Sequence, residues 1–246
     1  MSEFSGKSVV ITGGGTGVGA DMARAFADRG ATVTIGGRRE APLKSVAADH
    51  DTMRWGICDV TRTEDIEALF DMAGNVDIAI ANAGQADSSP MVRVTDADWD
   101  RLIAVNLTGV FLTYRAAAQR MSAGGRIISV ASMAGLHGLA YAAPYTAAKH
   151  GVVGLTKALA LELATRDITV NAICPGYLDT ELTDGSVAKI AAKTGKSEDE
   201  ARAILAGNNP MKRLIRVDEV TAAALFLASP AASSVNGTAI AITGGT

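Results

Sequence analysis

The sequence predicts an α/β fold: a single domain built on a doubly wound, seven-stranded parallel sheet with helices on both faces. Three observations support this prediction. Short apolar runs rich in β-branched residues alternate with helical patterns along the whole chain, which is typical of βαβ units. A glycine-rich turn follows the first of these runs. The 246 residues suit one compact domain, residues 1–246, with no Pro/Ser-rich linker or repeat.

The apolar runs predict the strands. The first run is β-branched and ends in glycines, and similar short runs follow it at intervals along the chain. The predicted strands are residues 8–12, 32–35, 53–57, 76–81, 126–131, 169–173 and 239–243.

Helical patterns fill the intervals between these runs. The first is closed by Gly30, the second carries Pro42 near its first turn, and the third has Thr63 as its expected N-cap. The predicted helices are residues 21–29, 41–48, 63–72, 98–121, 145–164 and 219–228.

One long segment, residues 178–216, departs from this alternation. It carries two helical patterns, and the second opens with a capping-box pattern at residues 197–200 and stops at Gly207. In a parallel sheet, a long excursion after the carboxyl end of a strand lies over the ligand crevice. We therefore expect residues 178–216 to form a substrate lid; the alternative is a surface decoration.

The composition argues against several classes of function. A formal net charge of −3 and a pI near 5.6 give no electrostatic support for nucleic-acid binding. Residues 1–7 do not form a signal-peptide pattern, no apolar stretch is long enough to cross a membrane, and the three histidines lack metal-ligand spacing. Cys58 and Cys174 sit in or beside apolar runs, so we expect buried, reduced thiols. These features predict a soluble cytoplasmic protein that binds no metal.

The glycine-rich turn at residues 12–19 joins the first strand to the first helix. Bare backbone N–H groups at a helix N-terminus bind phosphate, and side chains in the turn would block its approach. Gly13, Gly17 and Gly19 allow the turn, the close approach of a ligand and the packing of helix on strand. The turn therefore predicts a Rossmann-like dinucleotide site.

The end of the second strand bears on which dinucleotide binds. A carboxylate there would bind a ribose 2′-hydroxyl and repel a 2′-phosphate. The sequence instead has Gly36-Gly37-Arg38-Arg39. Because a guanidinium matches phosphate with a fork of N–H donors, the sequence favours NADP(H). NAD(H) is the alternative if both arginines face water.

A tyrosine and a lysine four residues apart, Tyr145 and Lys149, share one face of a predicted helix. A free phenol titrates near ~10, and a nearby ammonium favours the phenolate and lowers that pKa. The pair can therefore supply an acid–base group that works near neutral pH. Tyr141 has Tyr145, not a lysine, as its fourth neighbour, so we expect it to be a pocket wall or a surface ring.

Further motifs follow along the chain, and with the two above they closely resemble the classical short-chain dehydrogenase/reductase family over its whole length. They are Asn82-Ala83-Gly84, Asn106, Ser132, Pro175-Gly176 with Thr180, and Ile242-Thr243-Gly244-Gly245. The resemblance implies an NAD(P)(H)-dependent oxidoreductase that interconverts a secondary alcohol and a ketone by hydride transfer. It also implies assembly as a homotetramer or dimer.

The resemblance assigns roles residue by residue. Tyr145 would be the catalytic acid–base. Lys149 would lower its pKa and bind the nicotinamide ribose. Ser132 would polarise the substrate carbonyl, and Asn106 would position a water in a proton relay. The implied cofactor contacts are Gly13, Gly15, Thr16, Gly17, Val18, Gly19, Arg38, Arg39, Asp59, Val60, Asn82, Ala83, Gly84, Tyr145, Lys149, Pro175, Gly176, Leu178 and Thr180.

Four positions depart from the family pattern. Ala81 replaces the first asparagine of a common Asn-Asn-Ala-Gly motif. Thr16 stands where many NADP-dependent members carry a basic residue, so a 2′-phosphate would rely on the two arginines. Ile215 and Val217 replace a glycine and a proline, which leaves the path of the lid segment open.

Small or apolar residues are expected to wall the substrate pocket, among them Ala134, Gly135, Leu136 and Leu139. They suit a modest-sized apolar carbonyl or alcohol better than a polyol. Family analogy favours a 3-oxoacyl thioester or similar β-keto substrate, with a cyclic or steroid-like secondary alcohol as the alternative. A non-catalytic nucleotide-sensing relative is disfavoured because all the catalytic positions are retained. A sugar-nucleotide epimerase is disfavoured because the chain is too short for an extra substrate domain.

Overall fold

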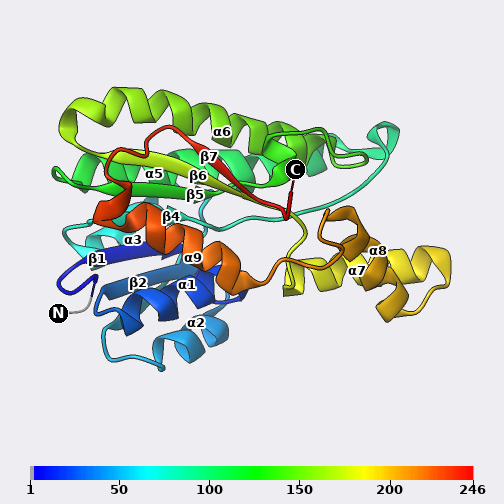
Figure 1. The fold of residues 1–246 in the computed structure, drawn as a ribbon, viewed down its shortest axis with the longest axis horizontal. Coiled ribbons are helices and arrows are strands. Elements are labelled where there is room, and N and C mark those ends of the chain that lie inside the picture. Colours follow the sequence, from blue (N-terminus) through cyan, green and yellow to red (C-terminus); the bar gives the residue numbers. More distant parts are fainter. Residues whose placement is uncertain (1–2, 246) are drawn as a thin grey trace.

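The computed structural model describes residues 3–245, so Met1, Ser2 and Thr246 of the predicted domain lie outside the described residues. Within that range the strands form one parallel sheet in the order β3-β2-β1-β4-β5-β6-β7 (Figure 1), which confirms the predicted fold class. The strands are β1 (Ser8–Thr12), β2 (Thr32–Gly37), β3 (Met53–Ile57), β4 (Ile78–Ala81), β5 (Arg126–Val130), β6 (Thr169–Pro175) and β7 (Ala239–Ile242).

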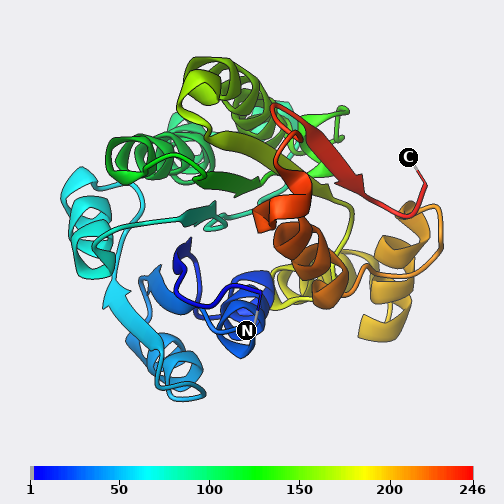
Figure 2. The same cartoon turned by 60° about the vertical axis from the view of Figure 1, so that its left-hand side comes forward.

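Helices cover both faces of the sheet, as Figure 1 and Figure 2 show. Strand residues divide between two cores because successive side chains point to opposite faces: Val9 and Ile11 join one apolar cluster, and Val10 joins the other. The first face carries α1 (Gly17–Asp28), α2 (Glu40–Ala47) and α9 (Val217–Ala228). The second carries α3 (Thr63–Ala73), α4 (Asp96–Ile103), α5 (Gly109–Arg120) and α6 (Ala143–Leu163).

Two helices lie apart from these layers. Figure 1 shows α7 (Glu181–Thr194) and α8 (Glu198–Asn208) beyond the carboxyl ends of the strands. The strand order reverses between β1 and β4, and ligands of such sheets bind outside the carboxyl ends at this reversal. The fold therefore places the segment between β6 and α9 at the edge where a ligand is expected.

The long helix predicted at residues 98–121 is present, but it is not α-helical throughout. The helical stretch begins earlier, at Asp96, where Thr95 and Asp98 form a capping box. A π turn, Ala104–Thr108, then separates α4 from α5 and contains Asn106. An apolar pattern does not distinguish this turn from α-helix, because the π turn adds a single residue to one turn.

Three local predictions also need correction. The first helix begins at Gly17 rather than residue 21, so the last glycines of the turn already belong to it. Thr63 is the first residue of α3 and not its N-cap, because Arg62 takes the extended conformation there. Gly207 lies inside α8, which ends one residue later; the chain leaves this helix through an extended Asn209 and needs no glycine. The capping box of Ser197 with Glu200 is confirmed.

Two further observations apply to residues 3–245. None of their helices has the length and apolar character needed to cross a membrane. No cluster of three or more His, Cys, Asp or Glu side chains within this range is arranged to hold a metal ion. Cys58 and Cys174 are both buried and unbridged, as expected.

Candidate active site

The glycine-rich turn is packed tightly against the end of β4. Gly13 has a φ of +69°, which favours glycine, and a Cβ there would lie 2.8 Å from the Ala83 Cα. The Asn82 side-chain amide donates to the carbonyls of Thr12 and Gly13, at 3.1 Å each. The motif after β4 therefore holds the turn in shape.

Gly19 is the tightest position of the turn, and we expect Gly19→Ala to destabilise the protein. A Cβ at Gly19 would lie 2.2 Å from the Gly13 carbonyl oxygen and 2.5 Å from the Asn82 Nδ2. Overpacking of this kind costs about 1–3 kcal/mol. Urea unfolding measures the loss. Gly154→Ala is the matched control, because a Cβ at Gly154 in α6 meets no atom within 4 Å and should stabilise the helix. Equal stability of Gly19→Ala and wild type would contradict the packing argument.

The N-terminus of α1 is suited to an anion. Its N-cap residue, Thr16, makes no side-chain capping bond, so the first-turn N–H groups carry no side-chain cap. Gly17, with a φ of +53°, keeps the backbone bare at the start of the helix. These features fit the pyrophosphate of a dinucleotide.

Tyr145 and Ser132 meet at the carboxyl edge of the sheet. Ser132 follows β5 and caps a short 3-10 helix, where its Oγ accepts the N–H of Ala134 at 3.1 Å. Tyr145 lies in the first turn of α6, whose second residue is the expected first-turn proline, Pro144. Burial raises the pKa of the Tyr145 phenol, and a hydrogen bond with the Ser132 side chain partly opposes that rise. The phenol therefore keeps its proton at neutral pH.

Lys149 is 3% exposed, and no carboxylate of residues 3–245 forms an ion pair with it. Burial lowers the pKa of its ammonium from 10.5 to about 8. Nζ donates to the Val130 carbonyl at 2.9 Å and lies 5.6 Å from the centroid of the Tyr145 ring. Burial and the Ser132 side chain are the main causes of the phenol's pKa in this structure, and the ammonium faces the ring and a carbonyl. The lowering of the Tyr145 pKa by Lys149 stays a prediction.

Asn106 anchors the loop after β4. Its Nδ2 donates to the carbonyls of Gln85 and Leu102 at 2.9 and 3.0 Å, and its Oδ1 accepts the Gln85 N–H at 3.1 Å. A side chain at Gly84 would come within 3.1 Å of this Oδ1 and 3.7 Å of the Lys149 Nζ. Asn106 thus holds the bare backbone of Gly84 beside Lys149.

Arg38 and Arg39, which follow β2, have different neighbours. Arg39 reaches across the glycine-rich turn, where its Nη2 donates to the Thr16 Oγ1 at 3.4 Å and to the Glu181 Oε2 at 3.3 Å. The Arg38 charge helps to lower the pKa of Asp59, although the main cause is the hydrogen bond from the Thr61 backbone. Both guanidiniums therefore lie at the turn end of the sheet.

The remaining predicted cofactor residues make packing and hydrogen-bond contacts within the fold. The Asp59 carboxylate accepts hydrogen bonds from the N–H and the hydroxyl of Thr61. Val60 packs against Gly109: a Cβ added at Gly109 would lie 2.7 Å from the Val60 Cγ2. Val18 and Ala83 line the apolar cores, and Gly15 packs near α2, where a Cβ would lie 3.3 Å from Pro42. The structure thus gives these residues packing roles, and their contacts with the cofactor stay a prediction.

The segment at residues 178–216, which the sequence predicts to be a lid, has its two ends joined to each other. Pro175 ends β6, and Gly176 donates to the Ile242 carbonyl at 3.0 Å. Leu178 and Ile215 form a parallel bridge, and the Ile215 N–H donates to the Tyr177 carbonyl at 2.9 Å. Ile215, which departs from the family pattern, is buried, and its bridge to Leu178 joins the two ends of the segment.

Two sets of contacts at this edge were not predicted from the sequence. Asn209 is 1% exposed, and its side chain binds both backbone groups of Tyr177, at 2.9 and 3.0 Å. Asp87 accepts from Lys189 of α7 at 2.6 Å and from Arg101 at 3.1 Å. A buried asparagine in a polar segment gives little sequence signal, and the ion pairs join residues far apart in the chain.

The expected pocket wall is only partly present. Ala134 and Gly135 are buried, and a Cβ at Gly135 would lie 2.7 Å from the Lys149 carbonyl oxygen, so both pack on α6. Leu136 and Leu139 are half-buried. Tyr141 is 67% exposed with a φ of 64°, which makes it a surface ring.

Comparisons with known proteins identify relatives of this chain. The family model described as enoyl-(acyl carrier protein) reductase matches residues 13–246. Cis-4-hydroxycyclohexanecarboxylate dehydrogenase of Sinomonas cyclohexanicum is 39% identical over 252 residues, which cover 98% of this chain and 97% of that protein. The 3-oxoacyl-(acyl-carrier-protein) reductase FabG of Rickettsia prowazekii (strain Madrid E) is 34% identical, with 100% and 98% of the two chains covered.

A solved structure agrees over the whole fold. A variant of actinorhodin polyketide ketoreductase with NADPH superposes with a TM-score of 0.92 at 32% sequence identity, and the match covers 100% of this chain and 98% of that one.

Proposed function

Since the chain belongs to the short-chain dehydrogenase/reductase family, we propose that Tyr145 exchanges the proton that accompanies hydride transfer between a nicotinamide cofactor and a small secondary alcohol or ketone. The observation that carries this proposal is the meeting of the half-buried Tyr145 phenol with the Ser132 hydroxyl at the carboxyl edge of the sheet. Replacing Tyr145 by phenylalanine tests it, as argued in the Discussion.

Each side chain has a step of its own in the proposed mechanism. The nicotinamide, when bound, supplies or accepts the hydride. Ser132 directs its hydroxyl proton to the substrate oxygen, because its Oγ already accepts the Ala134 N–H. Tyr145 gives its phenolic proton to the forming alkoxide, which suits a group whose pKa is raised by burial.

Lys149 and Asn106 support the phenol without touching the substrate in this proposal. The Val130 carbonyl is the acceptor that Lys149 reaches among the described residues, so its other N–H groups are free for the hydroxyls of a ribose. The Asn106 side chain is taken by Gln85 and Leu102, so it acts by fixing the loop beside Lys149 rather than by binding a relay water itself.

We propose NADP(H) as the preferred cofactor, with Arg38 and Arg39 as partners of the 2′-phosphate. Arg38→Ala is expected to weaken NADPH binding about 10- to 100-fold, which is the range for a charge-assisted hydrogen bond. NADH binding should change little, because NADH lacks that phosphate. Calorimetric titration of both cofactors measures the difference. Equal small losses for the two would mean that Arg38 faces solvent.

Two substrate classes follow from the relatives. A 3-oxoacyl thioester is the first candidate, by analogy with the FabG and polyketide ketoreductase relatives. A cyclic secondary alcohol is the second, and the 39% identical hydroxycyclohexanecarboxylate dehydrogenase favours it. Either substrate would enter beneath α7 and α8, which we propose to act as the lid because they lie beyond the strand ends.

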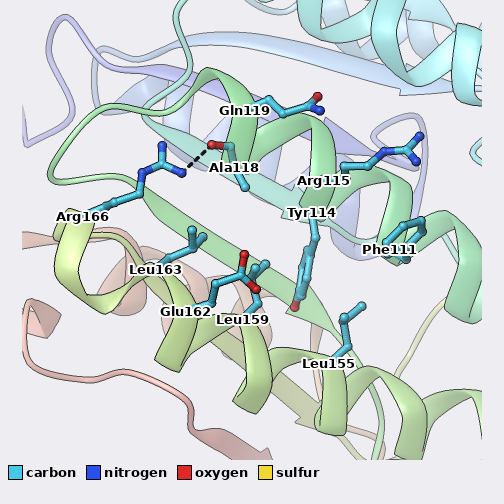
Figure 3. A pocket seen from close by; sticks show the side chains of 10 residues that line it. All are labelled: Phe111, Tyr114, Arg115, Ala118, Gln119, Leu155, Leu159, Glu162, Leu163 and Arg166. Carbon is cyan, nitrogen blue, oxygen red and sulfur yellow. Dashed lines mark hydrogen bonds between the residues drawn. The ribbon is translucent and has the colours of Figure 1, made fainter.

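We also propose that α5 and α6 meet a second copy of the chain, in a homotetramer or dimer. A hollow of about 540 Å³ lies between these helices. Figure 3 shows the side chains that line it. Phe111, Leu155 and Leu159 contribute apolar surface to it, and Arg166 closes one end through a 2.9 Å bond to the Ala118 carbonyl. An apolar face of this kind is typical of an obligate interface.

Phe111→Glu is expected to shift the protein to a smaller species in analytical ultracentrifugation. Phe111 is 42% exposed, so its replacement leaves the core of each copy intact while it places a charge in the proposed interface. Val92→Glu is the control, because Val92 is 93% exposed and lies outside both helices. An unchanged sedimentation of Phe111→Glu would argue against this face.

A further inference from the structure

The first residue of α7 is joined to the glycine-rich turn by one guanidinium. Arg39 contacts the Thr16 Oγ1 at 3.4 Å and the Glu181 Oε2 at 3.3 Å through the same Nη2. The neighbouring Thr180 also lies close to the turn, since a Cβ on Gly17 would be 3.6 Å from its Cγ2. The start of α7 and the N-terminus of α1 are therefore adjacent, and Arg39 bridges them.

The ion pair between Arg39 and Glu181 is weak enough for another anion to replace Glu181. The side chains of Arg39 and Glu181 are 64% and 67% exposed, so water screens the pair. Exposed ion pairs of this kind contribute about 0.2–1 kcal/mol. A phosphate monoester offers three acceptor oxygens and about −1.5 to −2 charges near pH 7, whereas the glutamate offers one charge. A phosphate that reaches Arg39 should therefore displace the carboxylate.

We infer that Glu181 determines cofactor specificity: its carboxylate pairs with the Arg39 guanidinium, where it competes with the cofactor's 2′-phosphate. The inference rests on the proposed function in one respect: Arg39 must be a partner of that phosphate. Binding of NADP(H) then breaks the bridge and frees the first turn of α7, whereas binding of NAD(H) leaves it intact. Glu181 thus weakens the binding of NADP(H) selectively.

The test is a double-mutant cycle on cofactor affinity. NADPH and NADH are titrated calorimetrically into wild type, Glu181→Gln, Arg39→Ala and the double variant. Glu181→Gln should tighten NADPH binding about 1.4- to 5-fold and leave NADH binding unchanged. The fold-change corresponds to the free energy of the exposed ion pair, which no longer competes with the phosphate. In the Arg39→Ala background the same substitution should have no effect on NADPH. Because Glu181 is exposed, its replacement should not disturb folding.

The control is Glu198→Gln in the first turn of α8. It makes the same charge change on the neighbouring helix, and Glu198 forms no ion pair within residues 3–245. Its NADPH affinity should equal that of wild type. Equal tightening by Glu198→Gln would mean that net charge, not the Arg39 bridge, sets the affinity.

Each contrary outcome has a distinct meaning. Equal tightening of NADPH and NADH by Glu181→Gln would show that the carboxylate repels the pyrophosphate common to both, which overturns the inference. Tightening that persists in the Arg39→Ala background would overturn it as well. If Arg39→Ala weakens NADPH selectively and Glu181→Gln changes nothing, the inference alone fails. If Arg39→Ala leaves NADPH binding unchanged, the proposed role of Arg39 at the 2′-phosphate fails, and the inference fails with it.

Discussion

Tyr145→Phe is expected to lower kcat about 10²- to 10⁴-fold while the affinity for the nicotinamide cofactor stays near that of wild type. The range is that of a general acid removed from a transition state. Phenylalanine keeps the ring that lies 5.6 Å from the Lys149 Nζ, and only the hydroxyl beside Ser132 is lost. Steady-state turnover followed by nicotinamide absorbance gives kcat, and calorimetry gives the cofactor affinity.

Tyr141→Phe is the matched control for this substitution. Tyr141 lies four residues earlier and is 67% exposed. Its φ of 64° is as accessible to phenylalanine as to tyrosine, so the substitution removes only a hydroxyl. Its kcat should remain near that of wild type. Turnover of Tyr145→Phe close to that of Tyr141→Phe would rule out Tyr145 as the acid–base.

Lys149→Met is expected to make the protein more stable at neutral pH although it impairs catalysis. Burial lowers the pKa of Lys149 from 10.5 to about 8. Below about pH 8, the folded protein must therefore hold a buried ammonium that the unfolded chain would hydrate. This difference in pKa corresponds to about 3 kcal/mol, and the lost hydrogen bond to Val130 offsets about 1 kcal/mol of the gain. A net gain of about 2 kcal/mol is expected.

The gain should depend on pH with a definite sign. Between about pH 8 and pH 10.5, the unfolded state binds more protons at Lys149 than the folded state, so this lysine's contribution to the free energy of unfolding rises with pH. The difference between Lys149→Met and wild type should therefore be largest below about pH 8 and shrink toward pH 10.5. Urea unfolding across this range measures it, with the exposed Lys157→Met on α6 as control. A difference that does not vary with pH would contradict a buried ammonium at Lys149.

The strands and the order of the motifs were predictable because their signals are local. The buried β1 reads as a short apolar run, so its predicted range, 8–12, agrees to the residue. The range 53–57 also agrees with β3, which is the partly exposed edge strand of the sheet. A polar group that follows a strand lies at the carboxyl edge, so Ser132 and Asn82 were placed correctly beside the turn and Tyr145.

The rest depended on contacts between distant residues. The direction of the Lys149 ammonium follows from the Val130 carbonyl, which lies on another element. The π turn around Asn106 has the same apolar pattern as an α-helix. The bridge from Arg39 to Glu181 spans 142 residues of sequence, so no spacing rule indicates it. Local patterns therefore predict which residues gather at the site, whereas tertiary packing decides which atoms face one another.

The transfer of deuterium from a labelled nicotinamide tests the central claim most directly. Wild type and Tyr145→Phe are mixed with NADPH or NADH that carries deuterium at the transferable position of C4, together with a ring ketone or a 3-oxoacyl thioester. Mass spectrometry then locates the label in the product. The account predicts deuterium on the carbinol carbon with wild type, faster from NADPH, and a rate reduced about 10²- to 10⁴-fold in Tyr145→Phe. Label transfer that proceeds equally fast in both proteins would contradict the role of Tyr145. If wild type labels no ketone from either cofactor, the proposed hydride transfer is contradicted.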